Sequence, residues 1–177
     1  MLKRIAITGP ESTGKSWLAA EIALHFQTLW IPEFARDFLS QLHRPYTLKD
    51  LEFIAVKQFV ANSAPQTDRD WIIADTEMLV CYIWANYVFG KVPELIQSLA
   101  NQQHFDFYLL CDIDLPWEPD PLREHPEKRS ELLALYIQEL QKRGLPYGIV
   151  SGQDTDRLLH AIHHIEEHFG VEAKQLL

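Results

Sequence analysis

Short apolar runs alternate with segments of helical periodicity along this chain. Two of these runs, residues 71–74 and 107–111, show no polar alternation and therefore predict strands that are buried on both faces. Three further apolar runs predict strands at residues 4–8, 28–31 and 147–150. Because strands and helices alternate throughout, we expect an α/β fold, with a five-stranded parallel sheet and helices on both of its faces.

The helices are predicted from apolar spacing and from signals at their ends. Leu18, Ile22 and Phe26 share one face of a first helix over about residues 16–26. Residues 47–50, Thr-Leu-Lys-Asp, have the form of a capping box ahead of a second helix. Most of the stretch between the third and fourth strands is expected to be helical, and two more helices are expected at residues 130–143 and 156–169.

Nothing in the sequence divides the chain into separate units. It contains no repeat, no low-complexity segment and no linker, so residues 1–177 are expected to form a single domain. His160, His164 and His168 recur every four residues on the last predicted helix. Because this row flanks the apolar stripe, we expect it to form a solvated face rather than a metal site.

Charge and cysteine content narrow the possible partners and the compartment. The formal net charge is −9, which argues against binding to nucleic acid or to an anionic membrane surface. Only Cys81 and Cys111 occur, at no metal-binding spacing, and both are expected to be packing residues in a reducing environment. No apolar run approaches the roughly 18 residues of a membrane span. We therefore expect a cytoplasmic protein with a small-molecule substrate; its oligomeric state stays open.

One motif carries specific chemistry. Residues 9–16, Gly-Pro-Glu-Ser-Thr-Gly-Lys-Ser, match the P-loop pattern GxxxxGK[ST] between the first strand and the first helix. Gly9 and Gly14 allow successive backbone N–H groups to converge on a β-phosphate, next to the positive end of the helix dipole. Lys15 then bridges the β- and γ-phosphates, and the Ser16 hydroxyl completes the shell of a magnesium ion. The motif predicts binding of ATP and Mg²⁺, with further nucleotide contacts from Glu11, Ser12, Thr13 and Trp17.

The residues at the ends of the other strands narrow the class of P-loop protein. A GTPase would carry Asn-Lys-x-Asp after a late strand, whereas residues 111–114 and 151–154 read Cys-Asp-Ile-Asp and Ser-Gly-Gln-Asp. A kinase needs carboxylates at the carboxyl ends of neighbouring strands. Glu33 follows the second predicted strand and suits a general base or an anchor for sugar hydroxyls, while Asp75 follows the third and suits magnesium or base duty. The sequence leaves the assignment of these two roles open.

A kinase also has to exclude water during transfer, usually with a mobile lid that carries arginines. Residues 115–130 are Pro-rich and charged, and they are expected to form a short lid of the nucleoside-kinase kind. Arg123 and Arg129 would swing over the nucleotide, and Arg36 is a candidate for the acceptor side. The alternative for Arg123 and Arg129 is an exposed charged loop without a catalytic role.

Several of these motifs together resemble a known family. The P-loop, residues 32–38 (Pro-Glu-Phe-Ala-Arg-Asp-Phe), residues 75–77 (Asp-Thr-Glu) and residues 117–123 (Trp-Glu-Pro-Asp-Pro-Leu-Arg) are similar to the ribosylnicotinamide kinase domain of bacterial NAD-biosynthesis proteins of the NadR type. The likeness extends over nearly the whole chain. It implies ATP-dependent phosphorylation of the 5′-hydroxyl of nicotinamide riboside to give nicotinamide mononucleotide. Pro121 stands where the family pattern is associated with glycine, which would stiffen the lid.

The implied substrate is consistent with the residues near the expected acceptor site. The nicotinamide ring of the riboside is a cation, and cations favour carboxylates and aromatic faces. Expected substrate contacts are Glu33, Arg36, Asp75, Glu77, Tyr87 and Trp117, with Phe34 and Trp84 as further aromatic candidates. Aromatic residues at helical spacing can equally be core residues. The alternatives kept open are a kinase of another nucleoside or small metabolite, and a regulatory P-loop ATPase.

Overall fold

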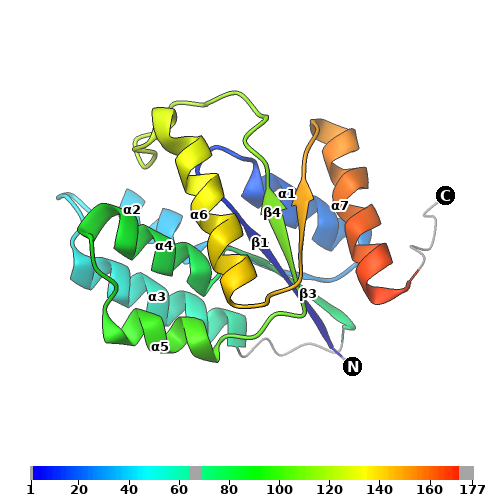
Figure 1. The fold of residues 1–177 in the computed structure, drawn as a ribbon, viewed down its shortest axis with the longest axis horizontal. Helices are drawn as coiled ribbons and strands as arrows, with labels where there is room; N and C mark the ends of the chain where they lie inside the picture. Colours follow the sequence, from blue (N-terminus) through cyan, green and yellow to red (C-terminus); the bar gives the residue numbers. More distant parts are fainter. Residues whose placement is uncertain (1, 64–68, 172–177) are drawn as a thin grey trace.

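The computed structural model describes residues 2–63 and 69–171, and its centre is one five-stranded sheet (Figure 1). All neighbouring strands run parallel, in the order β2-β3-β1-β4-β5, so the strand that leads into the P-loop is central. The strands are β1 (Lys3–Thr8), β2 (Leu29–Ile31), β3 (Trp71–Asp75), β4 (Phe107–Cys111) and β5 (Tyr147–Val150). The predicted fold class and all five predicted strands are confirmed, and the strand ends differ from the predicted ones by a residue at most.

Helices cover both faces of the sheet and also form an outer layer. One side of α4 packs against the sheet and its other side packs against α3 and α5, and Figure 1 shows these three helices together to the left of the sheet. None of the helices in the described part of the chain is long and apolar enough to cross a membrane. The helices are α1 (Lys15–His25), α2 (Phe34–Ser40), α3 (Leu48–Ser63), α4 (Met78–Phe89), α5 (Glu94–Gln102), α6 (Arg129–Lys142) and α7 (Asp154–Phe169), with a short 3₁₀ helix, η1 (Pro126–Lys128), before α6.

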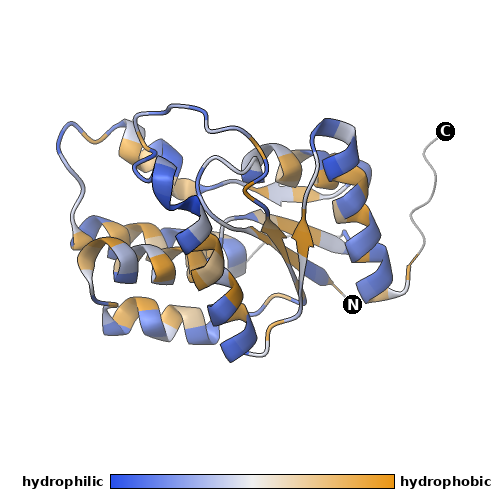
Figure 2. Ribbon diagram, turned by 45° about the horizontal axis from the view of Figure 1, so that its top comes forward, coloured by the Kyte–Doolittle hydropathy of each residue, from blue (hydrophilic) through white to orange (hydrophobic). Residues whose placement is uncertain are grey.

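The alternating side chains of the central strands feed two separate cores. Ile5 and Ile7 of β1 pack with α1 and α7 on one face, whereas Ala6 between them packs with α4 and α6 on the other. Every residue of β3 and of β4 is buried, as the absence of polar alternation predicted, and Figure 2 shows strands at the centre of the molecule coloured as hydrophobic. A third core joins α2 and α3 to the outer face of α4. Helix α2 was not anticipated, because its seven residues are too few to show a clear period.

The expected capping box begins the second predicted helix. The Thr47 backbone N–H donates to Asp50 Oδ2 at 2.7 Å, and the Asp50 N–H donates to Thr47 Oγ1 at 3.4 Å. Arg44 adds two hydrogen bonds to the same carboxylate, which lower the pKa of Asp50. The entry into α3 is therefore held by a local network that sequence spacing indicated correctly.

The histidine row on α7 is packed more closely than expected. His164 lies against β5, where its Nε2 atom is 3.0 Å from the Ile149 carbonyl oxygen, and burial lowers the pKa of its ring. His160 stacks on His164 at 4.7 Å, and His168 stacks on Phe107 at 4.3 Å. The prediction of a solvated face is wrong for His160 and His164, because α7 turns that side of the row toward the sheet.

This packing makes Gly148 of β5 sensitive to any added side chain. A Cβ atom there would lie 2.7 Å from Cγ of His164, closer than carbon atoms approach without displacement. We expect Gly148→Ala to lower the free energy of unfolding by about 1–3 kcal/mol, as overpacking does in cores. Chemical denaturation of G148A, H164A and the double variant tests this in a double-mutant cycle. The double variant should recover most of the loss; a fully additive loss would show that the imidazole is not the obstacle.

Candidate active site

The P-loop connects β1 to α1 and takes the backbone shape that its glycines permit. Gly9 has a φ of +132°, and a Cβ atom on it would lie 2.9 Å from the Cys111 carbonyl oxygen. Gly14 has a φ of +73° and begins α1 next to Leu115. The Thr13 hydroxyl donates to the Pro10 carbonyl oxygen at 2.8 Å and closes the loop on itself. The central strand, the tight loop and the following helix are the context in which such a loop cradles phosphate.

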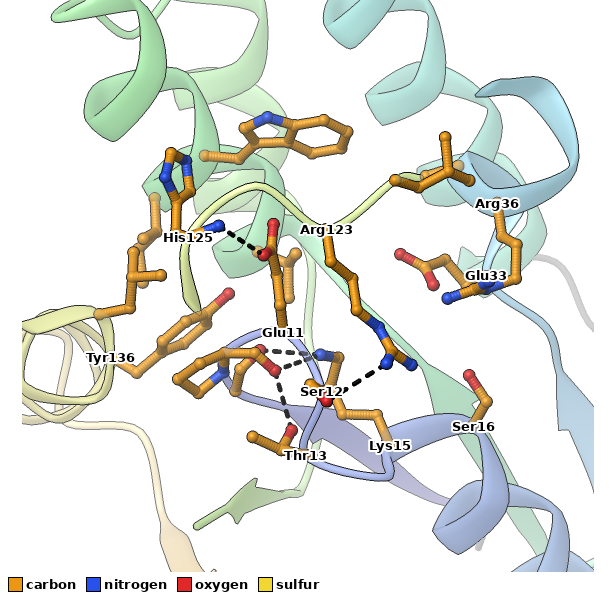
Figure 3. Close-up of a pocket in the computed structure, with 18 of the residues that line it drawn as sticks. Glu11, Ser12, Thr13, Lys15, Ser16, Glu33, Arg36, Arg123, His125 and Tyr136 are labelled. Carbon is orange, nitrogen blue, oxygen red and sulfur yellow. Dashed lines mark hydrogen bonds between the residues drawn. The ribbon is translucent and has the colours of Figure 1, made fainter. Parts of the chain in front are cut away.

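A cavity of about 360 Å³ opens over this loop. Its walls come from the loop itself, from α2, α4 and α6, and from the connection between β4 and α6, and Figure 3 shows side chains from these elements converging on it. Predicted site residues in the lining are Gly9, Glu11, Ser12, Thr13, Gly14, Lys15, Ser16, Trp17, Glu33, Arg36, Tyr87 and Arg123. The structure therefore brings residues from four separate stretches of sequence to one cavity.

Glu33 is the carboxylate that opens into this cavity. It follows β2 and precedes α2, and Figure 3 shows its carboxylate pointing inward beside Arg36. Although part of the side chain faces the cavity, the surrounding protein encloses it, and this burial raises the pKa of Glu33. Lys15 opposes the rise, whereas the nearby Asp75 carboxylate adds to it. A carboxylate held in this way is a stronger base than an exposed one.

Asp75 ends β3 below the loop and is 1% exposed. Burial raises its pKa, and a hydrogen bond from the Ser16 hydroxyl partly offsets the rise. Within the described residues, its Oδ1 atom is buried without a hydrogen-bond partner. An unpaired buried carboxylate oxygen beside a P-loop serine is the donor set that Mg²⁺ prefers, so Ser16 and Asp75 fit a magnesium ion.

Two polar residues of α3 hold the segments that carry these carboxylates. Gln58 accepts from the Phe34 backbone N–H at 2.8 Å and donates to Asn62 at 3.0 Å. Asn62 in turn donates to the Thr76 carbonyl oxygen at 3.2 Å. Both amides are almost fully buried, and they fix the residues that follow Glu33 and Asp75 relative to each other. The sequence gives no sign of this pair, since an isolated Gln and Asn on a helix carry no recognisable pattern.

The connection between β4 and α6 lies directly on the P-loop. Glu11 Oε2 accepts from the backbone N–H groups of Glu124 at 2.9 Å and His125 at 3.2 Å. Ser12 Oγ accepts from the backbone N–H of Glu118 at 2.9 Å and from Arg123 at 3.2 Å. The side chains of Glu11 and Ser12, which were expected to contact nucleotide, thus hold residues 118–125 in this structure.

Further contacts tie this connection to the cavity walls. Arg36 on α2 pairs with Asp120 at 2.9 Å. The Tyr46 hydroxyl donates to Glu124 at 2.8 Å and accepts from the indole N–H of Trp84 at 3.0 Å. Trp84, one of the aromatic candidates, lines the cavity.

Five of the predicted residues lie outside the cavity lining: Phe34, Asp75, Glu77, Trp117 and Arg129. Asp75 lies beneath the loop, and Arg129 donates to the carbonyl oxygens of Ser12 at 3.3 Å and Leu115 at 2.8 Å. The centre of the Trp117 ring lies 5.9 Å from the guanidinium carbon of Arg129, and the residue is not part of the cavity lining. Conversely, His125 and Tyr136 line the cavity without having been expected, because their positions depend on how α6 meets the connection before it.

Glu77 also lies outside the lining, and its role is structural in this geometry. It is 2% exposed, and it caps α4 by accepting from the Leu79 backbone N–H at 2.5 Å. Its other oxygen accepts from the Thr8 hydroxyl at 2.9 Å. Burial raises the pKa of Glu77 to about 7. A carboxylate at a strand end thus became a helix cap inside the core instead of a substrate contact.

Comparisons with known proteins agree with this architecture. Residues 4–157 match the family model AAA_28, described as an AAA domain. The trifunctional NAD biosynthesis/regulator protein NadR of Escherichia coli (strain K12) is 24% identical over 96% of this chain, which spans 43% of that protein. A crystal structure of NadR protein in complex with NR has a TM-score of 0.82 at 22% identity, covering 99% of this chain and 54% of that one. Thymidylate kinase from Ehrlichia chaffeensis has a TM-score of 0.68 at 14% identity, covering 93% and 97% of the two chains.

The buried cap Glu77 predicts a specific dependence of stability on pH. Because its pKa is raised from 4.5 to about 7, the folded state holds a proton that the unfolded state releases. This contribution to stability is complete below pH 4.5 and is lost as pH rises through 7. The free energy of unfolding of the wild type should therefore decrease between pH 5 and pH 8. We expect Glu77→Gln, whose amide can bond to both Thr8 and Leu79, to remove on the order of 3 kcal/mol of this decrease.

Urea denaturation at several pH values measures this effect, with the exposed Glu94→Gln as a matched control that should follow the wild type. If the free energy of unfolding changed with pH in the same way for E77Q and the wild type, Glu77 would be ionised in the folded protein at pH 5.

Proposed function

We propose that this chain, which belongs to the AAA_28 family of AAA domains, is an ATP-dependent kinase that phosphorylates the 5′-hydroxyl of nicotinamide riboside to give nicotinamide mononucleotide. The observation that carries the proposal is that Glu33 and Lys15 line one cavity, so that a base and a phosphate-binding cation face the same space. The similarity to NadR, which is known in complex with NR, supports the choice of acceptor.

In this reaction Glu33 is the general base. The 5′-oxygen of the acceptor forms a bond to the γ-phosphorus while the bond from that phosphorus to the β,γ-bridging oxygen breaks, and ADP leaves. The hydroxyl proton passes to the Glu33 carboxylate. A raised pKa suits this role, because a base whose pKa is closer to the working pH accepts the proton with more driving force.

The charge that develops on the transferred group is met by cations already at the cavity. Lys15 at present donates to the carbonyl oxygens of Gly9 at 3.0 Å and Pro10 at 2.7 Å, so its ammonium is held at the mouth of the loop. Arg123 reaches the loop from the opposite side through Ser12. Ser16 and Asp75 would hold Mg²⁺, which when bound neutralises phosphate charge. The residues of this chain supply the positioning.

Residues 115–130 act as the lid in this proposal. Their bonds to Glu11 and Ser12 place them over the P-loop, and the pairing of Arg36 with Asp120 joins them to α2. Pro119, Pro121 and Pro126 limit the conformations of this segment, so opening would involve movement about its ends rather than within it.

The acceptor ring would lie in the part of the cavity lined by Trp84, Tyr87 and Tyr136. Flat aromatic faces and the Glu33 and Glu11 carboxylates are suited to a cationic ring on a ribose.

Two free, buried cysteines, Cys81 and Cys111, are consistent with reaction in a reducing cytoplasm.

A kinase of another nucleoside is the second candidate. The fold is shared with thymidylate kinase and with a deoxyadenosine kinase from M. mycoides, the latter with a TM-score of 0.61 and 17% identity. A regulatory P-loop ATPase is the alternative of another class, and its sign would be slow ATP hydrolysis that no small acceptor stimulates.

The deciding measurement is ADP release with Mg²⁺ and ATP, in the presence and absence of nicotinamide riboside, with the product identified by mass. Riboside-dependent ADP and a mass equal to nicotinamide mononucleotide are expected. Lys15→Ala should show neither. Stimulation by thymidine or deoxyadenosine, but not by the riboside, would replace the proposed acceptor, and stimulation by none would favour the regulatory ATPase.

Substitutions of Glu33 and Asp75 should affect different kinetic quantities. We expect Glu33→Gln to lower kcat by about 10²–10⁴-fold and to leave the KM for ATP within about threefold, because a general base acts in transfer rather than in nucleotide binding. Asp75→Asn should instead raise the Mg²⁺ concentration needed for half-maximal rate. The exposed Glu94→Gln is the control. An E33Q enzyme with normal kcat would exclude Glu33 as the base.

The pH profile gives an independent check on Glu33. A base is active when ionised, so log kcat should fall as pH falls through the pKa of Glu33, which lies above 4.5 because the group is buried. The same descent should be absent in E33Q. A profile that is unchanged by the substitution would assign the titration to another group.

A further inference from the structure

Arg157, in the first turn of α7, is a fully buried charge that the proposed mechanism does not use. One terminal nitrogen, Nη1, donates to Asp114 Oδ1 at 2.7 Å and to the Gly152 carbonyl oxygen at 2.9 Å. The other, Nη2, donates to the carbonyl oxygens of Thr13 at 2.9 Å and Asp112 at 3.1 Å. Burying a guanidinium is costly unless it is paired and hydrogen-bonded, and this set of acceptors meets both conditions for the two terminal nitrogens, whereas Nε is buried without a partner among the described residues.

These acceptors belong to three segments at the carboxyl edge of the sheet. Asp112 and Asp114 follow β4, Gly152 follows β5, and Thr13 is part of the P-loop. The first two segments are also bonded to each other, since Asp114 Oδ2 accepts from the Gly152 backbone N–H at 2.5 Å and the Ser151 hydroxyl donates to Asp112 at 2.8 Å. The ends of β4 and β5 therefore form a rigid seat for the guanidinium, and its remaining contact is with the P-loop.

That contact acts on a peptide unit of the phosphate cradle. The Thr13 carbonyl and the Gly14 N–H are the two ends of one planar trans peptide, so they point in opposite directions. Because the carbonyl is directed at Arg157, the N–H is directed away from it, and Gly14 lines the cavity whereas Arg157 does not. A charge-assisted hydrogen bond to the carbonyl fixes the plane of this peptide and polarises its N–H, making it a better donor to an anion.

We propose that Arg157 is a positioning residue for nucleotide binding, which holds the Thr13–Gly14 peptide with its N–H turned toward the phosphates and strengthens that donor. The inference rests on the ATP-binding part of the proposed function and is independent of which acceptor is used. Gly152 is part of the device: with a φ of +99°, it brings the loop so close that a Cβ atom would lie 3.2 Å from the Arg157 backbone nitrogen.

The test is the Kd of a nonhydrolysable ATP analogue with Mg²⁺, measured by calorimetry on Arg157→Lys. Lysine keeps the charge, but its single ammonium cannot reach acceptors in all three segments. We expect Kd to rise about tenfold, the effect of weakening one charge-assisted hydrogen bond, while the KM for the acceptor stays within about twofold. Arg143→Lys makes the same change at the far end of α6, where Arg143 pairs with Glu139, and should leave Kd unchanged.

Arg157 could instead contribute to stability alone. To separate this role from the proposed one, Kd is measured at a temperature at which circular dichroism shows each variant to be folded. A lowered Tm with an unchanged Kd for R157K would overturn the proposal.

If R157K does not fold, Asp114→Asn decides. Arg157 and Gly152 donate to different oxygens of Asp114, and asparagine replaces one of these oxygens with an NH2 donor, so the seat of the guanidinium is loosened while the arginine remains. Kd should rise roughly threefold, and an unchanged Kd would overturn the proposal. Because Kd is measured without acceptor, a failure here is separate from failure of the riboside assay.

Discussion

The parallel direction of all five strands is the constraint on which the site depends. Since every carboxyl end lies at one edge, the P-loop after β1, Glu33 after β2 and Asp75 after β3 meet without any long-range design of the loops themselves. The order β2-β3-β1 places the two carboxylates on one side of the loop. The ends of β4 and β5 take the other side, where Arg157 is seated.

Buried polar groups convert this rough convergence into fixed geometry. Gln58 and Asn62 hold the segments after β2 and β3, and Glu77 caps α4 from inside the core. Arg157 does the same for the P-loop from the side of α7. Each is a polar residue with its partners supplied by backbone or by another side chain, so its burial is tolerated, and each acts on a segment that bears a functional group.

The sequence predicted the parts of the site that are local and not those that depend on tertiary contacts. The P-loop and the strand ends at Glu33 and Asp75 were predicted because spacing and position along the chain determine them. Glu77 was expected near substrate for the same reason, but only packing shows that its side chain turns inward to Thr8. Trp117 was likewise expected to face the acceptor, yet its ring lies against Arg129. Arg157 gives no signal in sequence, because its four acceptors are brought together only by the fold.

The hydrogen bonds between the P-loop and residues 118–125 limit which segments can be exchanged between related proteins by recombination. In the P-loop pattern the residues between the two glycines are free to vary, but here Glu11 and Ser12 accept four hydrogen bonds from that connection. The motif and the connection therefore form one module, although about a hundred residues separate them along the chain. A chimaera that inherits one without the other would mismatch its own halves, so recombination between relatives should preserve the two segments as a pair.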